Sequence, residues 1–378
     1  MKTTLGDIFE IGSGGTPSKA HPEYYGGEIP WVKTGDLKEE YLFSVEDCIT
    51  EEGLKNSSAK MYEPGTVLIA MYGATIGATS ILKFDACTNQ ACAAFKPCKD
   101  VKPEYLYYFL RSKKQKFISD GVGGAQPNIS AGYLKKVQID VRNPEEQDCI
   151  ITVLDGVNSV IQERQRELDL LDKLIKARFV EIFGDPVVNE KGWNTTTLLG
   201  ALEKGRTVSY GIVQTGDDVE DGIPVFRPID IAGGHIPKRE ELKKTLPEIS
   251  AKYKRTLLEG NELLITVRGS VGETFQVDEV FSGCNVGRNI VPLVTDHTRV
   301  NQRFLQELFS QQPIKNWLKD ITKGIALQGL NMSEFKEMPV IVPPMDRQEQ
   351  FVLFAKQVDK SKVVAEKNWN IHNVCLIA

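Results

Sequence analysis

The chain has 378 residues, a length at which two or three domains are more usual than one. With 41% hydrophobic and 26% charged residues, its composition is that of a folded soluble protein and argues against collagen-like and disordered classes. No apolar run reaches the roughly 18 residues of a membrane span, and the first residues form no hydrophobic targeting stretch, so we expect a cytoplasmic protein without a membrane anchor. The net charge of −5 excludes a uniformly basic nucleic-acid binder but leaves room for a local basic face.

The cysteines and histidines do not have the spacing of a metal site. The seven cysteines include no C-x-x-C pair, and the four histidines stand far apart. An odd, scattered set of cysteines is also a poor disulfide framework. The sequence therefore predicts reduced, mostly buried thiols and no zinc site.

Residues 1–143 have the pattern of a mixed globular block. The apolar run 66–72, bounded by turn residues, predicts a buried strand, and the alternating run 137–141 predicts a second one. Between them, residues 103–117 predict helical structure. We expect a strand-rich α+β block.

A long helix is predicted over residues 144–185. Asn143 fits the N-cap, Pro144 fits the first helical position, and Gly184 fits the end, which leaves a helix of about 60 Å. Apolar residues recur along it at steps of three and four, as in the seam of a coiled coil; they include Leu154, Val157, Ile161, Leu168, Leu171 and Ile175. Because such a seam would otherwise be an exposed apolar stripe, it predicts a partner helix.

Residues 186–344 predict a second block, and residues 345–378 a second helix. The second block repeats the plan, with strands at 263–267 and 338–342 and helical structure at 301–317. The second helix carries Phe351, Ala355 and Val358 at seam spacing, which makes it the natural partner of the first. Its pattern fails after about Lys367, so we expect it to be some ten to fifteen residues shorter than the first.

The two blocks are related by an internal repeat. The stretch 29–37 reappears at 223–231, and 73–77 at 269–272. Cys87 and Asn89 are interpreted as the counterparts of Cys284 and Asn285, and the stretch 126–130 as that of 328–333. The offset drifts slowly from 194 to about 202, as small loop insertions would produce. We interpret this as a duplication into two similar halves.

In their order, these doubled stretches resemble the specificity (S) subunits of type I restriction–modification systems. The most telling are Ile29 to Leu37, Gln126 to Ser130 followed by Pro144 to Gln147, and the helical run Leu171 to Phe179. The resemblance covers nearly all of the chain. The exception is the C-terminus, where no copy of residues 171–185 follows Val364.

The resemblance implies a fold and a function. The fold would be α+β, with two target-recognition domains (1–143 and 186–344), a central conserved helix (144–185) and a distal, shortened one (345–378). The helices would pair as an antiparallel coiled coil with pseudo-twofold symmetry. The chain would recognise a bipartite site in double-stranded DNA and direct two DNA-methyltransferase subunits to it, and possibly restriction subunits. It would be non-catalytic and bind no cofactor; S-adenosylmethionine, ATP and Mg²⁺ would belong to the partners.

Candidate DNA-binding residues come from basic clusters and from the repeat. Lysine and arginine neutralise phosphates, and arginine, asparagine and glutamine can also bond base edges. In the first half the candidates are Lys33, Thr34, Tyr72, Lys113, Lys114, Lys116, Gln126 and Asn128. In the second half they are Arg227, Lys243, Lys244, Lys254, Arg255, Arg268, Arg288, Asn289 and Gln328.

Other readings remain open at this point. The glycine-rich stretch 12–15 could cradle a phosphate or be a DNA-facing or structural loop, but it lacks the lysine and Ser/Thr of a P-loop. Asp36-Leu37-Lys38 fits a nuclease-like D-x-K, a triplet that is common by chance. An adenine-methyltransferase motif and the usual hydrolase motifs are missing from the sequence. The alternative function is that of a truncated or silent variant acting only as a protein-interaction scaffold.

Overall fold

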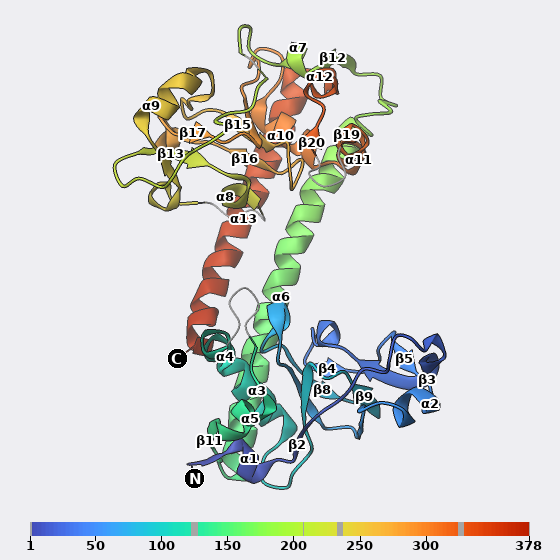
Figure 1. Cartoon of the computed structure of the whole chain (residues 1–378). Helices are drawn as coiled ribbons and strands as arrows, with labels where there is room; N and C mark the ends of the chain where they lie inside the picture. Colours follow the sequence, from blue (N-terminus) through green and yellow to red (C-terminus); the bar gives the residue numbers. More distant parts are fainter. Residues whose placement is uncertain (1, 122–127, 207, 233–236, 324–328, 378) are drawn as a thin grey trace. The chain divides into compact units, whose positions relative to one another are not determined.

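The chain folds into two compact units that are described separately here. The computed structural model describes residues 2–121, 128–206, 208–232, 237–323 and 329–377, with side chains, apart from that of Lys323, as far as Ala365. Unit 1 contains residues 1–163 and 369–378, and unit 2 contains residues 164–368 (Figure 1). The long helix α6 (Pro144–Phe183) therefore begins in unit 1 and ends in unit 2.

Unit 1 is built on two mixed sheets and one short antiparallel pair. In sheet order the strands are β2 (Ile11–Ser13), β10 (Cys92–Phe95), β7 (Val67–Ala70), β8 (Thr79–Leu82) and β4 (Tyr41–Leu42); β5 (Cys48–Ile49), β3 (Tyr25–Val32), β9 (Ala86–Thr88) and β6 (Met61–Tyr62); and β1 (Lys2–Thr4) with β11 (Gln138–Asp140). The predicted strands 66–72 and 137–141 are confirmed in shorter form as β7 and β11. All four residues of β7 are buried, which explains its continuous apolar run.

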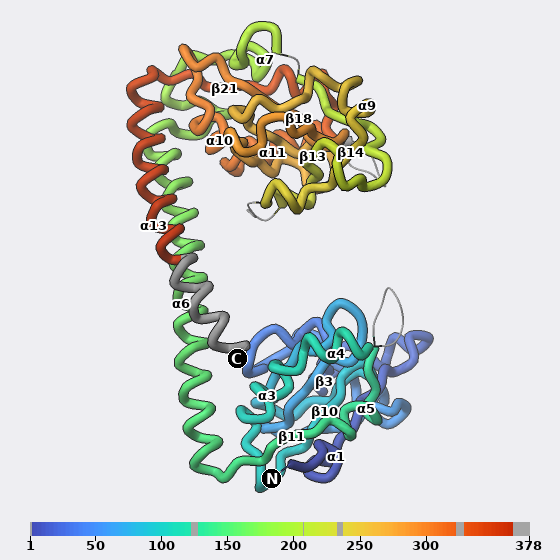
Figure 2. Tube along the Cα trace, turned by 90° about the vertical axis from the view of Figure 1, so that its left-hand side faces the viewer, coloured from blue at the N-terminus to red at the C-terminus, as the bar shows by residue number. Residues whose placement is uncertain are grey.

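Helices cover the central sheet of unit 1. They are α1 (Leu5–Ile8), α2 (Glu51–Lys55), α3 (Pro103–Ser112), α4 (Lys114–Asp120) and α5 (Ala131–Lys136). Helix α3 packs across β7 and β8, and Figure 2 shows α3 and α4 beside β10. The predicted helical run 103–117 is thus confirmed as two helices, α3 and α4.

Unit 2 repeats this plan with shorter sheets. Its strands are β12 (Asn194–Thr197) with β21 (Pro339–Val342); β14 (Lys244–Thr245), β13 (Ile223–Phe226) and β17 (Asn285–Val286); β16 (Thr274–Gln276), β15 (Leu263–Thr266) and β18 (Ile290–Leu293); and β19 (Thr322–Lys323) with β20 (Gly329–Leu330). Its helices are α7 (Leu198–Ala201), α8 (Pro228–Ile231), α9 (Pro247–Ser250), α10 (Gln302–Ser310), α11 (Gln312–Asp320) and α12 (Met332–Lys336).

The strand pairings confirm the internal repeat. Strand β3 is parallel to β9 as β13 is to β17, and β7 lies between β8 and β10 as β15 lies between β16 and β18. The short pair β1–β11 corresponds to β12–β21. Two details of the predicted alignment are wrong. Trp31 pairs with Cys87 as Val225 pairs with Asn285, so Cys87 corresponds to Asn285 and not to Cys284. Ser130 caps α5 as Asn331 caps α12, so Ser130 corresponds to Asn331 and not to Ser333.

The predicted first helix is confirmed as α6, and its start is a capping box. The Glu146 amide donates to Asn143 Oδ1 (2.8 Å), and the Asn143 amide donates to the Glu146 carboxylate (3.2 Å). Helix α13 (Met345–Ile377) has 33 residues against 40 for α6, so it is seven residues shorter and not ten to fifteen.

None of the described helices is long and apolar enough to cross a membrane.

Within unit 2 the end of α6 packs on the start of α13. Phe179 and Phe183 stack edge-on against Phe351, with ring centroids 5.4 and 5.5 Å apart, and Lys362 Nζ lies 2.5 Å from the Asp172 carboxylate. The expected seam residues Ile175, Phe351, Ala355 and Val358 are buried, with Leu171 packed beside them. Sequence periodicity missed Phe179 and Phe183, which are fully buried and centre this contact.

Nearer its start, α6 packs on a globular block. Leu154 contacts the hydrophobic core of unit 1 together with Ile150 and Ile151. Val157, Ile161 and Leu168 are half-buried. The apolar residues of α6 therefore do not form one continuous seam with α13. Those near its start cover the core of unit 1, and those near its end pack on α13.

Candidate nucleic-acid interface

In unit 1, the loops after two parallel strands begin side by side. Strands β3 and β9 end together, with Val32 opposite Thr88, so Lys33 and the turn 89–92 leave the sheet at the same end. The Asn89 amide donates to the Val32 carbonyl (2.9 Å), and the Cys92 amide closes the turn on the Asn89 carbonyl (3.3 Å). Gln90 is exposed in the middle of this turn.

Strand β7 brings further loops to the same place. The Met71 amide donates to the Ala91 carbonyl (2.8 Å), and the Ile129 amide donates to the Met71 carbonyl (3.0 Å). Tyr72, which is 43% exposed, forms an isolated bridge with Asn128. Three candidates far apart in the sequence thus converge with the turn that carries Gln90. We call Lys33, Thr34, Tyr72, Gln90 and Asn128 the loop end of unit 1.

The loop end of unit 2, which consists of Arg227, Arg268, Arg288, Asn289 and Gly329, is assembled by equivalent hydrogen bonds. The Gly287 amide donates to the Phe226 carbonyl (2.9 Å), and the Val267 amide donates to the Asn289 carbonyl (2.8 Å). Arg268 bridges to Gly329 as Tyr72 bridges to Asn128. These contacts make Lys33 the counterpart of Arg227, Tyr72 that of Arg268 and Gln90 that of Arg288.

Two of these cations are partly engaged within their own unit. Lys33 Nζ lies 2.5 Å from Asp47 Oδ2 and 5.3 Å from the centre of the Trp31 ring. Arg227 donates two hydrogen bonds to the Asp230 carboxylate (3.1 and 2.9 Å), which raise the pKa of the guanidinium. The Arg227 guanidinium cannot make bidentate hydrogen bonds to Asp230 and to a guanine at the same time. Lys33 and Arg227 are therefore better suited to contacting a phosphate than to reading a base.

Arg268 and Arg288 are exposed, and their planar donors remain available at the loop end of unit 2. The Arg268 guanidinium lies 6.0 Å from the Tyr210 ring, a distance at which a cation–π contact holds the side chain in place. Asn289 Oδ1 is buried and has no hydrogen-bond partner among the described residues. The two arginines can donate to guanine edges, and an asparagine amide can both donate to and accept from an adenine edge.

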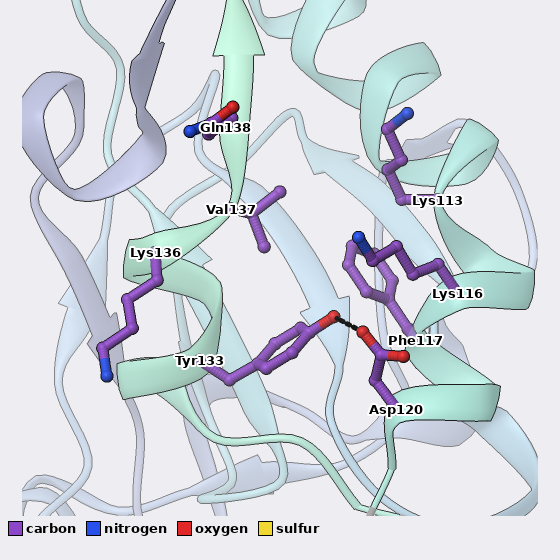
Figure 3. Close-up of a pocket in the computed structure, with 8 residues that line it drawn as sticks. All are labelled: Lys113, Lys116, Phe117, Asp120, Tyr133, Lys136, Val137 and Gln138. Atoms are coloured by element: carbon purple, nitrogen blue, oxygen red, sulfur yellow. Dashed lines mark hydrogen bonds between the residues drawn. The ribbon is translucent and has the colours of Figure 1, made fainter.

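The three predicted lysines of unit 1 surround the start of α4. A Cβ added to Gly77 would lie only 2.8 Å from Lys114 Cγ. Helix α4 therefore packs directly on the turn after Tyr72. Lys113 and Lys116 line a cavity of about 570 Å³ between α4 and α5 (Figure 3). The structure therefore gathers this cluster beside the loop end of unit 1.

The basic clusters of unit 2 are placed differently. The ammonium groups of Lys243 and Lys244 donate hydrogen bonds to the carbonyls of Gly216 (2.5 Å) and Glu220 (2.7 Å), respectively, and so hold the loop before β13 in place. Lys254 and Arg255 are exposed on the 3-10 segment η6 (Ala251–Thr256), which packs on β17. Gln126 and Gln328 lie outside the described residues.

The glycine-rich stretch has a structural reason. A Cβ on Gly14 would lie 1.7 Å from the Thr88 carbonyl oxygen, and one on Gly211 would lie 1.8 Å from the Val286 carbonyl oxygen. Because they lack a Cβ, Gly14 and Gly211 allow a loop to pass close to the last residue of β9 and of β17, respectively. Asp36, from the nuclease-like triplet, accepts the Lys33 amide (2.7 Å), as Asp230 accepts the Arg227 amide (2.7 Å). Both features thus belong to the repeated fold.

Sequence reasoning missed two residues of this surface. Thr16 donates its hydroxyl proton to Gln90 Oε1, which fixes the glutamine at the loop end. Tyr210, under Arg268, was also missed. The signal that could have found Gln90 is its position, since it corresponds to Arg288 once the repeat is aligned through the strand pairings.

Comparisons with known proteins agree with this architecture. A family model described as the type I restriction modification DNA specificity domain matches residues 1–170 and again 191–372. The specificity subunit of the type I restriction enzyme MjaIX from Methanocaldococcus jannaschii is 29% identical over 399 residues, which cover 95% of this chain and 87% of that protein.

Two solved structures share the fold. The S subunit of a type I restriction–modification system from M. genitalium covers all of this chain and 93% of its own, with a TM-score of 0.51 and 15% identity. A chain from a structure on complex assembly and conformational transition of the type I system gives a TM-score of 0.56 at 15% identity, covering all of this chain and 95% of its own.

Fold and repeat together define a protein with two successive DNA specificity domains. The chain belongs to the type I restriction modification DNA specificity family.

Proposed function

We propose that this chain is the specificity subunit of a type I restriction–modification complex and that each unit recognises one half of a bipartite DNA site. The observation that carries the proposal is the repeated loop end. In both units, the same strand pairings bring exposed polar or cationic side chains to one place, but the side chains differ: Tyr72 against Arg268 and Gln90 against Arg288. A common scaffold with different donors suits two different half-sites.

The two long helices would set the distance between the half-sites. The contacts of Phe179 and Phe183 with Phe351, and of Asp172 with Lys362, support an antiparallel coiled coil between α6 and α13. A helix of 40 residues extends about 60 Å, and paired with a second helix it would hold a fixed spacing. The target-recognition domains would be residues 1–143 and 186–344.

The chemistry would reside in partner subunits. Two DNA-methyltransferase subunits would bind S-adenosylmethionine and modify the site, and restriction subunits would use ATP and Mg²⁺. The chain itself would be non-catalytic and cytoplasmic. The match of the chain to the DNA specificity family supports this division of labour.

Reconstitution tests the proposal directly. The full chain, its methyltransferase subunits and labelled S-adenosylmethionine are combined with DNA, together and with each protein left out. We expect methyl transfer only when both proteins are present. Transfer by the chain alone would mean that it is an enzyme, and transfer that does not depend on the chain would leave it the role of a scaffold.

A further inference from the structure

One cavity of unit 1 has the chemistry of an anion site. It lies between α4 and α5 and is lined by Lys113, Lys116, Asp120, Tyr133 and other residues, with a volume of about 570 Å³. Figure 3 shows Lys113, which precedes α4, and Lys116 of α4 on one side of the cavity, and Tyr133, Val137 and Gln138 on the other. Lys136 also lines the cavity, but its ammonium group points away from it. Lys113 Nζ lies 5.6 Å from the centre of the Phe109 ring, and its side chain is half-buried, so its ammonium group is held close to the protein.

The one acidic group of this cavity is engaged. Tyr133 donates its hydroxyl proton to Asp120 Oδ2 (2.7 Å), and the Ser119 hydroxyl donates to Oδ1 (3.3 Å). Loss of solvent and the bond to Asp120 raise the pKa of Tyr133 to about 12, so the tyrosine stays a donor at working pH. The buried Phe117 ring supports the Tyr133 ring edge-on at 6.2 Å. The carboxylate is thereby turned to the tyrosine, and the ammonium groups remain for a ligand.

The cavity adjoins the loop end of unit 1. Lys114, between Lys113 and Lys116, packs on Gly77, and Gly77 closes the turn that follows Tyr72. A duplex whose bases meet Tyr72, Gln90 and Asn128 would carry its phosphates near α4, because the phosphates of a strand flank the groove in which its base edges are read. A protein's acidic segment would have no such reason to lie here.

On the side of α12, unit 2 does not repeat the charge of this cavity. The helix caps Ser130 and Asn331 align α5 with α12, so Glu334 stands at the position of Tyr133 and Glu337 at that of Lys136. The Glu334 carboxylate accepts a hydrogen bond from the Asn331 side-chain amide (2.6 Å), and the exposed Glu337 carboxylate would repel a phosphate where Lys136 would attract one. The feature therefore belongs to unit 1 among the described residues.

We propose that the α4–α5 cavity binds one backbone phosphate of the DNA, through Lys113 and Lys116, and that this anchor exists on the first half-site alone. The inference rests on the proposed DNA recognition and adds to it that the two half-sites are held unequally. Phosphate contacts would contribute more to the binding of the first half-site, and the arginines of the loop end would contribute more to the binding of the second.

The test measures DNA affinity against salt concentration. The full chain, assembled with its methyltransferase subunits, is titrated with labelled duplex carrying the recognised site. The K113Q/K116Q double variant should bind about three- to tenfold more weakly, and its slope of log affinity against log salt should be shallower by about 0.9, the loss of one phosphate contact. The methylated sequence should not change, because phosphate contacts carry no base information.

Two further variants separate this role from a loss of fold. Asp120→Asn removes the one negative charge of the cavity and should tighten binding, an effect that damage to the fold does not produce. Lys99→Gln is the matched control. Lys99 is exposed and follows β10 at the opposite end of the sheet from Tyr72, since Phe95 pairs with Val67 and Cys92 with Ala70. It should leave affinity and slope unchanged.

An unchanged salt slope in K113Q/K116Q would overturn the inference, as would weaker binding in Asp120→Asn. Weaker assembly with the methyltransferase subunits at an unchanged slope would also overturn it, since the cavity would then serve a protein partner. Failure of the proposed function itself would look different, because the wild-type complex would not prefer its bipartite duplex over a scrambled one.

Discussion

At the residue scale, each long helix is held to its own globular block by one buried glutamine. Gln147 accepts the Lys102 amide (2.9 Å) and donates to the carbonyls of Asp100 (2.8 Å) and Arg142 (2.9 Å). Gln348 makes the same three bonds in unit 2, with the Asn301 amide and the carbonyls of Arg299 and Pro343. The burial and the partners of the two glutamines depend on loops that no periodicity describes.

Gln147→Leu should destabilise unit 1. The change leaves one amide and two carbonyls without partners in a buried place, which costs about 2–4 kcal/mol of unfolding free energy. Urea unfolding of the full chain measures it. Gln165→Leu, at an exposed position of the same helix, is the control and should change little. Equal midpoints for the two variants would contradict the role of Gln147.

The thiols give a pH-dependent prediction. Burial raises the pKa of Cys87 and Cys92 to about 12 and that of Cys284 to about 11, from a usual value of 9. Since the unfolded thiols ionise first, their contribution to stability is complete below about pH 9 and declines as the pH rises towards 12. Urea unfolding at pH 8 and pH 10 should show lower stability at pH 10. A stability that rises over this interval would contradict the assignment.

Alkylation distinguishes the same cysteines by exposure. Cys149 is exposed on α6, whereas Cys87, Cys92 and Cys284 are buried. With iodoacetamide at pH 8, mass spectrometry should find Cys149 modified well before these three, because only an accessible thiolate reacts. Modification of all four at one rate would mean that the buried sites open readily.

At the element scale, the long helices were predictable and their contacts were not. Helix α6 has a clear cap at Asn143 and a clear end at Gly184, so its bounds could be read from the sequence. The predicted seam included Ile175 but not Phe179 and Phe183, through which the buried line continues. Which face is buried depends on where α10 and α13 meet the helix, and that is a property of the tertiary fold.

Phe351→Ala tests this meeting point. Phe351 is fully buried against Phe179 and Phe183, so its truncation should cost about 3–5 kcal/mol of the stability of unit 2. The control is Leu353→Ala on the same helix, because Leu353 is 63% exposed. Thermal unfolding of the full chain compares them. If Leu353→Ala were as damaging as Phe351→Ala, the packing described for α13 would be wrong.

At the scale of the whole molecule, the repeat could be found in the sequence, but the candidate interface could not. Tyr72 and Asn128 are 56 positions apart, and only the bridge after β7 brings them together. Gln90 escaped notice because its counterpart Arg288 becomes apparent only when strand pairings correct the alignment. Lys243 and Lys244, by contrast, have the sequence of a basic patch but fasten a loop.

The helices predict how spacing responds to length. Seven residues inserted after Glu163 keep the seam in phase and lengthen α6 by about 10 Å, the rise of about three base pairs. With a matching insertion in α13, the gap between the half-sites should lengthen by up to three base pairs, and both half-sites should stay the same. An unchanged gap in the methylated motif would contradict the spacer role.

The most direct test of the central claim is a genome-wide map of DNA methylation in the source cell with and without this gene. The account predicts that one bipartite motif, two short defined sequences around a gap of fixed length, loses its methylation when the gene is deleted and regains it when the full chain is restored. An identical methylation map in the two strains, with the gene and its methyltransferase partners expressed, would contradict it.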